Sequence, residues 1–550
     1  MKVLIIGGYG TFGFNIAERL ANEVELELIL AGRNLSQAKA ACQKLAGKAA
    51  TVTPMLVDRA NFKLSVKPDM IVDASGPFQR YSVSPLADYC IQHGIHYADL
   101  SDNSIETHRA KTQYSNQSCG SSILAFGLST CPVLSAVGLR EVENAIGPAT
   151  DVTIGIAPSP KANLGLNVVA AAANYAGQKT VNVLKNGTTL RVAGLTEVRS
   201  ETISVPGCAP LPRLPFAVAD AADALVLPDN FPSLTGIWTG AGTRPIWLHR
   251  LLVYLATGVG LGVLPKLSPF AKLFHRSKSF FRFGSHRGGM FVRASNANGE
   301  ASWHLVAEGD DGPRIPALPV VALIRKILHG NFPAAGSYSG DQLISFDHLK
   351  PEFGSLDISY GLHYDGADLA VYEKVLGDAY QRLAPAVIEH HRAKPNRHYA
   401  GRCKVTRGQN PLSHIVAAIV GFPASGDDLP VTVIVTPDEK GELWTRKFGD
   451  QIFKSHHSLA CGRWARHVTE KFGPISIHMA ILEEEGRLKI QTQGWSFLGI
   501  PLPKFLKPGG KVYETENEQG QFVFYVDIKA PIFGRLCKYE GWLDPIDMAV

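Results

Sequence analysis

Three glycines near the start of the chain, Gly8, Gly10 and Gly13, have the spacing GxGxxG, which can bind the phosphates of a dinucleotide. The first glycine of such a turn allows the tight bend, the second lets the backbone approach a pyrophosphate, and the third allows close helix–strand packing. The predicted binding turn comprises Gly8, Tyr9, Gly10, Thr11, Phe12 and Gly13.

The elements that flank the glycines favour this interpretation over a purely structural turn. Residues Lys2–Ile6 form a short apolar, β-branched run that predicts a buried parallel strand. Phe12, Ile16 and Leu20 have helical spacing, so a helix begins where the glycines end. The free N–H groups of its first turn would face the phosphates.

The end of the second predicted strand, residues 25–34, indicates which cofactor binds. An NAD site usually places an acidic residue here for the ribose hydroxyls, whereas this strand ends Gly32-Arg33-Asn34. Arg33 could bind a 2′-phosphate through paired hydrogen bonds, or it could be a solvated loop cation. We expect NADP rather than NAD, with Asn34 at the site and also capping a helix with Gln37.

Alternating strands and helices continue over residues 1–150 and predict a Rossmann domain, a doubly wound parallel sheet of the α/β class. Further strands are expected at 50–58, 69–78, 95–100 and 121–132. Their loops add cofactor-binding candidates: Asp58 near the adenine, and Ser75, Gly76 and Pro77 near the nicotinamide.

No residue stands out as the catalytic proton donor. Tyr81, Tyr97 and Asp99 are the candidates near strand ends, and each also has a structural interpretation. We predict no metal site. Adjacent histidines within 389–398 and 454–458 point in different directions and are expected to be solvated.

The motifs "IIGGYGTFG", "AGRN", "DASGPF", "HYADLSD" and "AFGLSTCP", in this order, resemble the saccharopine dehydrogenase-like NAD(P)-binding oxidoreductases. Residues 286–294 and 308–319 are similar to the second domain of that family. "GWSFLGIPLPKFLKP" and "GRLCKYEGWLDP" are similar to an uncharacterised C-terminal domain that is fused to such reductases. The resemblance implies NAD(P)-dependent hydride transfer, with the residues named above holding the cofactor.

The resemblance leaves the substrate open. A saccharopine site needs clustered cations, and the middle of the chain offers only the scattered Arg244, Arg250, Arg287 and Arg293. Apolar segments are more prominent. We therefore expect an NADP-dependent oxidoreductase acting on an apolar or lipid-like small molecule. A non-catalytic sensor or scaffold that binds NADP and lipid, and an amino-acid imine reductase of the saccharopine type, remain as alternatives.

Beyond the first domain, an α+β second domain is expected over 151–360 and a mostly antiparallel β-rich domain over 372–550. The proline-dense stretch 205–216 predicts an extended connection over the surface. A helix-rich hinge is expected at about 367–393, and Glu485-Gly486 is a hairpin signal.

Composition limits the partners. The net charge of +6 is small for 550 residues and no basic stripe is present, so nucleic acid is not expected. The eight cysteines are scattered and no signal peptide is recognised, which indicates a cytoplasmic protein. The apolar segment 251–264 is too short to span a bilayer and is either a core helix or a peripheral membrane contact. Whether the chain forms a homodimer is left open.

Overall fold

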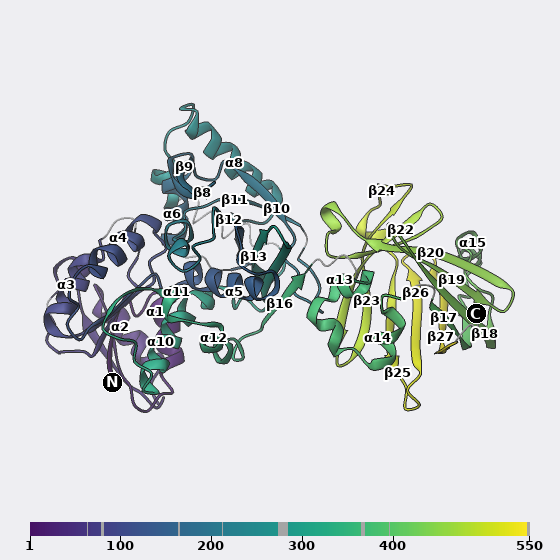
Figure 1. Ribbon diagram of the computed structural model, residues 1–550, viewed down its shortest axis with the longest axis horizontal. Helices are drawn as coiled ribbons and strands as arrows, with labels where there is room; N and C mark the ends of the chain where they lie inside the picture. The colour runs from purple at the N-terminus through teal and green to yellow at the C-terminus, as the bar shows by residue number, and fades with distance from the viewer. Residues whose placement is uncertain are drawn as a thin grey trace. The chain divides into compact units, whose positions relative to one another are not determined.

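The computed structural model describes residues 1–62, 64–76, 78, 82–162, 166–211, 213–272, 284–364, 369–394 and 397–546. The chain folds as two compact units, whose helices and strands are labelled in Figure 1. The first unit contains Met1–Glu201 and Leu214–Ile358, and the second contains Thr202–Arg213 and Ser359–Val550.

The first unit begins with a seven-stranded parallel sheet, which confirms the predicted Rossmann-like fold. Its strands, in order across the sheet, are β15 (Gly336–Ser339), β6 (Ile123–Phe126), β5 (His96–Asp99), β4 (Met70–Asp73), β1 (Lys2–Ile6), β2 (Glu27–Gly32) and β3 (Thr51–Leu56). The chain order reverses between β1 and β4, and ligands of such sheets bind in the crevice outside this point. The sequence did not predict β15, which returns to the sheet from far along the chain.

Helices follow most of these strands along the chain. They are α1 (Thr11–Leu20), α2 (Leu35–Lys44), α3 (Ser84–His93), α4 (Ser104–Ser115) and α5 (Ser135–Ile146). Helix α1 buries Ile16 and Leu20 on one face, as their spacing requires. Helix α3 ends at Gly94, whose φ of +64° a glycine adopts without strain.

A mixed sheet forms the rest of the first unit and confirms the α+β prediction. In it β12 (Gly236–Gly242) runs parallel to β7 (Asp151–Ala157), whereas β7 is antiparallel to β13 (Gly288–Asn296). The other strands are β8 (Lys179–Lys185), β9 (Thr188–Ala193), β10 (Val198–Glu201), β11 (Leu214–Val218) and β14 (Gly299–Ala307). The helices are α6 (Leu166–Tyr175), α7 (Asp223–Val226), α8 (Ile246–Gly260), α10 (Leu318–Leu328), α11 (Gly340–Leu343) and α12 (Phe346–Phe353).

Two further segments differ from simple expectation. Helix α8 is only partly a core helix: Ala256 and Val259 belong to a buried apolar cluster, and His249 is the one other residue of the helix that is buried. No helix among the described residues is long and apolar enough to cross a membrane. The proline-dense stretch was wrongly predicted to run over the surface, since Val205 and Leu211 are each only 2% exposed. Prolines have no N–H that burial would leave without a partner, so such a stretch can be buried.

The second unit is an antiparallel barrel, which confirms the prediction of a β-rich C-terminal region. Its strands are β17 (Arg397–Arg407), β18 (Gly426–Asp438), β19 (Gly441–Phe448), β20 (Gln451–Leu459), β21 (Val468–Phe472), β22 (Ile475–Glu484), β23 (Arg487–Phe497), β24 (Ile500–Pro501), β25 (Gly509–Glu516), β26 (Phe522–Ala530) and β27 (Gly534–Pro545). The sheet closes because β22, at one end of the strand order, also pairs with β23 near the other.

Helices and a tight turn complete the barrel as the sequence indicates. Strand β16 (Ile358–Tyr364) leads the chain into the second unit, and α13 (Val371–Leu376) and α14 (Pro385–His391) fall within the predicted helical hinge. A further helix, α15 (Pro411–Val420), lies between β17 and β18. Glu485 and Gly486 join β22 to β23 with positive φ at both residues, the geometry of a type I′ hairpin.

The histidines of this region were wrongly predicted to be solvated. His390, His391 and His457 are only 1%, 0% and 3% exposed, whereas His456 is half-buried. His457 points into the barrel because alternate residues of β20 face inward, and this register was not visible in the sequence. No group of three or more His, Cys, Asp or Glu side chains in the described ranges could hold a metal ion.

Candidate functional site

The glycine turn joins β1 to α1 at the carboxyl edge of the parallel sheet. Gly7 has a φ of +82°, and a Cβ there would lie 2.8 Å from the Ala74 carbonyl oxygen of the neighbouring loop. A Cβ on Gly13 would lie 2.3 Å from the Gly7 carbonyl oxygen, so this glycine is required for close packing. At Gly10 the added Cβ would meet only that same oxygen, at 3.2 Å. Space is therefore open at the position where the predicted pyrophosphate approaches.

The first turn of α1 presents hydrogen-bond donors to this open space. Gly10 is the N-cap and has no side chain to cap the helix. The first intrahelical bond runs from the Phe14 N–H to the Gly10 carbonyl, so the preceding N–H groups have no helical acceptor. Such a helix end favours an anion through its free donors and its dipole.

The end of β2 is shaped by Tyr9, which belongs to the glycine turn. A Cβ on Gly32 would lie 2.5 Å from the Tyr9 ring, and the Tyr9 hydroxyl accepts a hydrogen bond of 3.1 Å from the Asn34 N–H. The Asn34 side chain accepts from the Gln37 N–H at 3.0 Å and thereby caps α2, as predicted. Arg33 is exposed and forms no ion pair within the described residues. Its guanidinium can therefore approach a ligand at this edge.

The remaining cofactor candidates follow β3 and β4. Asp58 is exposed, and its carboxylate accepts a hydrogen bond of 3.0 Å from the Ala60 N–H. Ser75 donates its N–H and hydroxyl to Asp73 Oδ1, over 3.1 and 2.5 Å. Gly76 is half-buried. Two of the predicted residues, Pro77 and the donor candidate Tyr81, lie outside the described residues.

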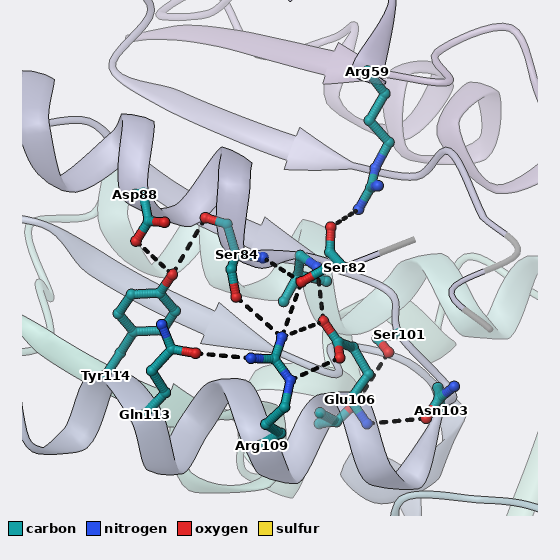
Figure 2. Close-up of polar contacts among 12 residues, drawn as sticks. Arg59, Ser82, Ser84, Asp88, Ser101, Asn103, Glu106, Arg109, Gln113 and Tyr114 are labelled. Atoms are coloured by element: carbon teal, nitrogen blue, oxygen red, sulfur yellow. Dashed lines mark hydrogen bonds and ion pairs between the residues drawn. The ribbon is translucent and has the colours of Figure 1, made fainter. Parts of the chain in front are cut away.

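Two arginines bind residues that come before and after the loop following β4. Sequence reasoning missed both of these arginines. Arg59 donates to Asp73 Oδ2 over 2.7 Å and to the Ser82 carbonyl over 3.1 Å. Figure 2 shows Arg109 among Glu106, Ser82 and Ser84, with its Nη2 donating to the two serine hydroxyls over 2.9 and 3.0 Å. Arg59 and Arg109 thus hold Ser82, while Arg59 also holds the end of β4. No spacing in the sequence indicates these contacts.

Tyr97 and Asp99, the other two donor candidates, are both fully buried at the end of β5. Asp99 Oδ1 accepts from the N–H groups of Ser101 and Gly127, over 2.9 and 2.8 Å, so this carboxyl organises two loops. Burial raises the pKa of Asp99 to about 7. The Tyr97 hydroxyl and Asp99 Oδ2 have no hydrogen-bond partner within the described ranges. Neither side chain can exchange a proton with a substrate from this buried position unless other groups relay the proton.

Sequence reasoning also missed two further acids, Asp220 and Asp223. Asp220 is half-buried, and its carboxyl accepts a hydrogen bond of 2.7 Å from the Ser104 hydroxyl at the start of α4. Asp223 is fully buried and accepts from Thr239 over 3.1 Å. Burial raises the pKa of each carboxyl to about 6. Asp220 is the accessible member, and a carboxyl with such a pKa can exchange a proton near neutrality.

The structure therefore gathers the described cofactor candidates along one edge of the sheet. Ile6 lies beside Ala31 on one side and Asp73 on the other, and Gly32 lies beside Leu56, so the loops after β1, β2, β3 and β4 are neighbours. Asp73 in turn lies beside Asp99 of β5. This edge can hold an extended dinucleotide from β3 to β4, with ionisable groups beyond β4.

Two regions of the chain match known family models. Residues 3–124 match the family model described as the saccharopine dehydrogenase NADP binding domain. Residues 383–543 match DUF4166, a domain of unknown function. The resemblance drawn from the motifs is confirmed for these two regions. No curated protein matches the sequence.

Solved structures with similarity to the chain include two dehydrogenases. Saccharopine dehydrogenase (L-Glu forming) from Saccharomyces cerevisiae is 12% identical with a TM-score of 0.45, over 66% of this chain and 100% of that one. A probable dehydrogenase from Thermotoga maritima is 12% identical with a TM-score of 0.33, over 66% of this chain and 98% of that one. A DUF3598-family protein of unknown function from Nostoc punctiforme is 8% identical with a TM-score of 0.20, over 48% of this chain and 68% of that one.

Proposed function

We propose that this chain, which carries the saccharopine dehydrogenase NADP binding domain at residues 3–124, is an NADP-dependent oxidoreductase with an apolar substrate. The observation that carries the proposal is the open space at Gly10, beside a helix end with free N–H groups. This space fits a pyrophosphate, because a side chain would fill it and the neighbouring donors have no helical acceptor. NADPH bound there supplies a hydride to the substrate.

Arg33 supports NADP over NAD. Its guanidinium is exposed where β2 ends, and Asn34, beside it, uses its side-chain oxygen to cap α2. An acidic residue at this strand end would repel a 2′-phosphate, whereas a guanidinium binds it with charge-assisted hydrogen bonds. The expected role of Arg33 is therefore to hold the 2′-phosphate.

Asp220 is the proposed proton donor for the reaction. It is half-buried beside the start of α4, and its raised pKa of about 6 lets it carry a proton to or from the substrate. The Ser104 hydroxyl holds the carboxyl in place over 2.7 Å. Asp99 and Asp223 are fully buried, so we assign them a structural role.

The ion pairs that the arginines form within the chain favour an apolar substrate over saccharopine. Arg287 is paired with Glu308 over 2.7 Å, and Arg293 with Glu201 over 3.3 Å, so these cations are already neutralised by acids of the chain. Helix α8 instead exposes large apolar side chains: Trp247 is 53% exposed and Tyr254 71% exposed. Such a helix can lie on a membrane surface, from which an apolar substrate would come.

The test is hydride tracing with NADPH that carries deuterium at C4. We expect deuterium to appear, in the presence of the protein, in the chloroform-soluble fraction of a cell extract. The Asp220→Asn variant should bind NADPH as the wild type does and transfer deuterium more slowly, with an altered pH profile. Label in a water-soluble product other than the cofactor would overturn the apolar substrate but keep the reaction class. Absence of transfer by a protein that binds NADPH would overturn the oxidoreductase proposal.

A further inference from the structure

The barrel of the second unit encloses a cavity of about 360 Å³. Small-molecule sites have volumes of about 300–1,000 Å³, so the cavity is large enough for a ligand. Its wall is mainly apolar and includes Val433, Phe453, Ile477, Ile490 and Phe524. These side chains come from strands on all sides of the barrel, because alternate residues of each strand face inward.

One part of the wall is a polar cluster that consists of Tyr372, Arg446, His457 and Glu470. His457 lies opposite Glu470 on the adjacent strand, and its Nε2 is 3.1 Å from the Glu470 carboxylate. The Tyr372 hydroxyl is 2.9 Å from His457 Nδ1, and Arg446 donates to the Ser455 hydroxyl over 2.8 Å. Burial alone would raise the pKa of Glu470, but His457 and Arg446 outweigh it and lower that pKa to about 2. Glu470 is therefore a carboxylate with its charge balanced.

The other acid in the wall is also matched by a base. Glu514 lies 2.5 Å from Nε2 of His391, which is fully buried. An anionic ligand would meet Glu470 and Glu514 inside a wall of low dielectric, and a cationic ligand would meet Arg446. Burying an additional charge without a partner is costly. The wall thus favours a ligand without net charge.

His390 provides the hydrogen-bonding group for such a ligand. It lines the cavity, is 1% exposed, and stacks on Phe522 with 3.8 Å between ring centroids. Its Nδ1 has no hydrogen-bond partner in the described part of the chain. Burial lowers the pKa of His390 well below its ordinary value, so the ring is neutral and has one donor and one acceptor nitrogen. A ligand hydroxyl can donate to or accept from Nδ1, and a ligand carbonyl can accept from Nδ1 when that nitrogen carries the proton.

The cavity opens at an apolar rim. Ile532, in the turn between β26 and β27, both lines the cavity and is 62% exposed. Leu498, Ile500 and Phe505, near β24, are 71%, 67% and 75% exposed. Leu506, which follows Phe505, lines the cavity. Exposed apolar side chains that continue into a cavity provide an entry path for an apolar molecule.

We propose that the barrel binds a neutral lipid that bears a single hydroxyl or carbonyl group. The apolar body fills the cavity, and the polar group hydrogen-bonds His390 beside the Tyr372–His457–Glu470 cluster. This inference is independent of the proposed reaction, because no residue of the first unit enters it. It assigns a ligand site to a domain of unknown function.

The test uses the full chain and two fluorescent probes, a long-chain fatty alcohol and the fatty acid of the same chain length. We expect saturable binding of the alcohol and at least about tenfold weaker binding of the acid. Ile490→Trp fills the cavity and should abolish binding. Gln491→Trp, the matched control on the exposed face of the same strand, should bind as the wild type does.

His390→Phe tests the polar end of the site. Phenylalanine keeps the stack on Phe522 and removes the nitrogens, so the alcohol should bind about tenfold more weakly in a protein that stays folded. Equal loss of binding in Ile490→Trp and Gln491→Trp would overturn the cavity as the site. Absence of alcohol binding by the folded wild type, or tighter binding of the acid than of the alcohol, would overturn the proposed ligand class.

Discussion

The two glycines at the start of α1 should respond in opposite ways to the same substitution. Gly10 has φ −75° and ψ 169°, a conformation open to any residue, and a Cβ there meets only one atom, at 3.2 Å. Gly10→Ala should therefore change the free energy of unfolding by about 1 kcal/mol or less. The methyl group would instead occupy the open space where the pyrophosphate is proposed to bind.

The cost to cofactor binding follows from the contacts that the methyl group blocks. Each hydrogen bond between a phosphate and an N–H is worth about 1.5–3 kcal/mol. Gly10→Ala should thus weaken NADPH binding by about ten- to 150-fold. Gly13→Ala is the matched comparison, because its Cβ would lie 2.3 Å from the Gly7 carbonyl oxygen and 2.8 Å from the Gly7 carbonyl carbon. That clash outweighs the helix propensity of alanine and should destabilise the protein by about 1–3 kcal/mol.

Thermal unfolding and calorimetric titration of NADPH, measured on both variants and the wild type, separate the two effects. We expect Gly10→Ala to keep its unfolding temperature and lose affinity, and Gly13→Ala to unfold at a lower temperature. A folded Gly10→Ala protein that binds NADPH as tightly as the wild type would refute the assignment of this turn. Unchanged stability of Gly13→Ala would refute the packing argument.

Three further predictions concern charge and surface. Burial raises the pKa of Asp99 to about 7, so the free energy of unfolding should fall as pH rises from about 4 to about 7. Denaturant titrations across that range should show a smaller fall for Asp99→Asn. Glu352 is buried between Arg19 and Arg325, so Glu352→Gln should lower the free energy of unfolding by about 3 kcal/mol. A loss below about 0.5 kcal/mol in urea unfolding would contradict this. Leu251→Asp with Tyr254→Asp changes only exposed residues of α8 and should abolish co-sedimentation with anionic vesicles without shifting the unfolding temperature.

The sequence was informative where structure is local. The glycine turn, its flanking strand and helix, the Asn34 cap and the Glu485-Gly486 hairpin each depend on neighbouring residues, and each was predicted correctly. The antiparallel character of the C-terminal region also followed from short alternating runs, since strand periodicity is a local property.

Features set by distant contacts could not be predicted. β15 joins the first sheet beside β6 from far along the chain, and Asp220 meets Ser104 across 116 positions. Barrel register decides which histidines face inward, so His390 and His457 were misjudged as solvated. Composition alone also could not show which face of α8 is buried, because the segment is apolar all round. Only packing against the rest of the unit buries Ala256 and leaves Tyr254 exposed.

The central claim, NADP binding along the carboxyl edge of the first sheet, is tested most directly by titrating NADPH and NADH into the wild type and Arg33→Ser. Arg191→Ser, at an exposed arginine on β9, is the control. We predict that the wild type and the control prefer NADPH, and that Arg33→Ser weakens NADPH binding by about 1.5–3 kcal/mol while leaving NADH unchanged. Equal affinities of the wild type for NADPH and NADH, or an Arg33→Ser protein with undiminished NADPH affinity, would contradict the account.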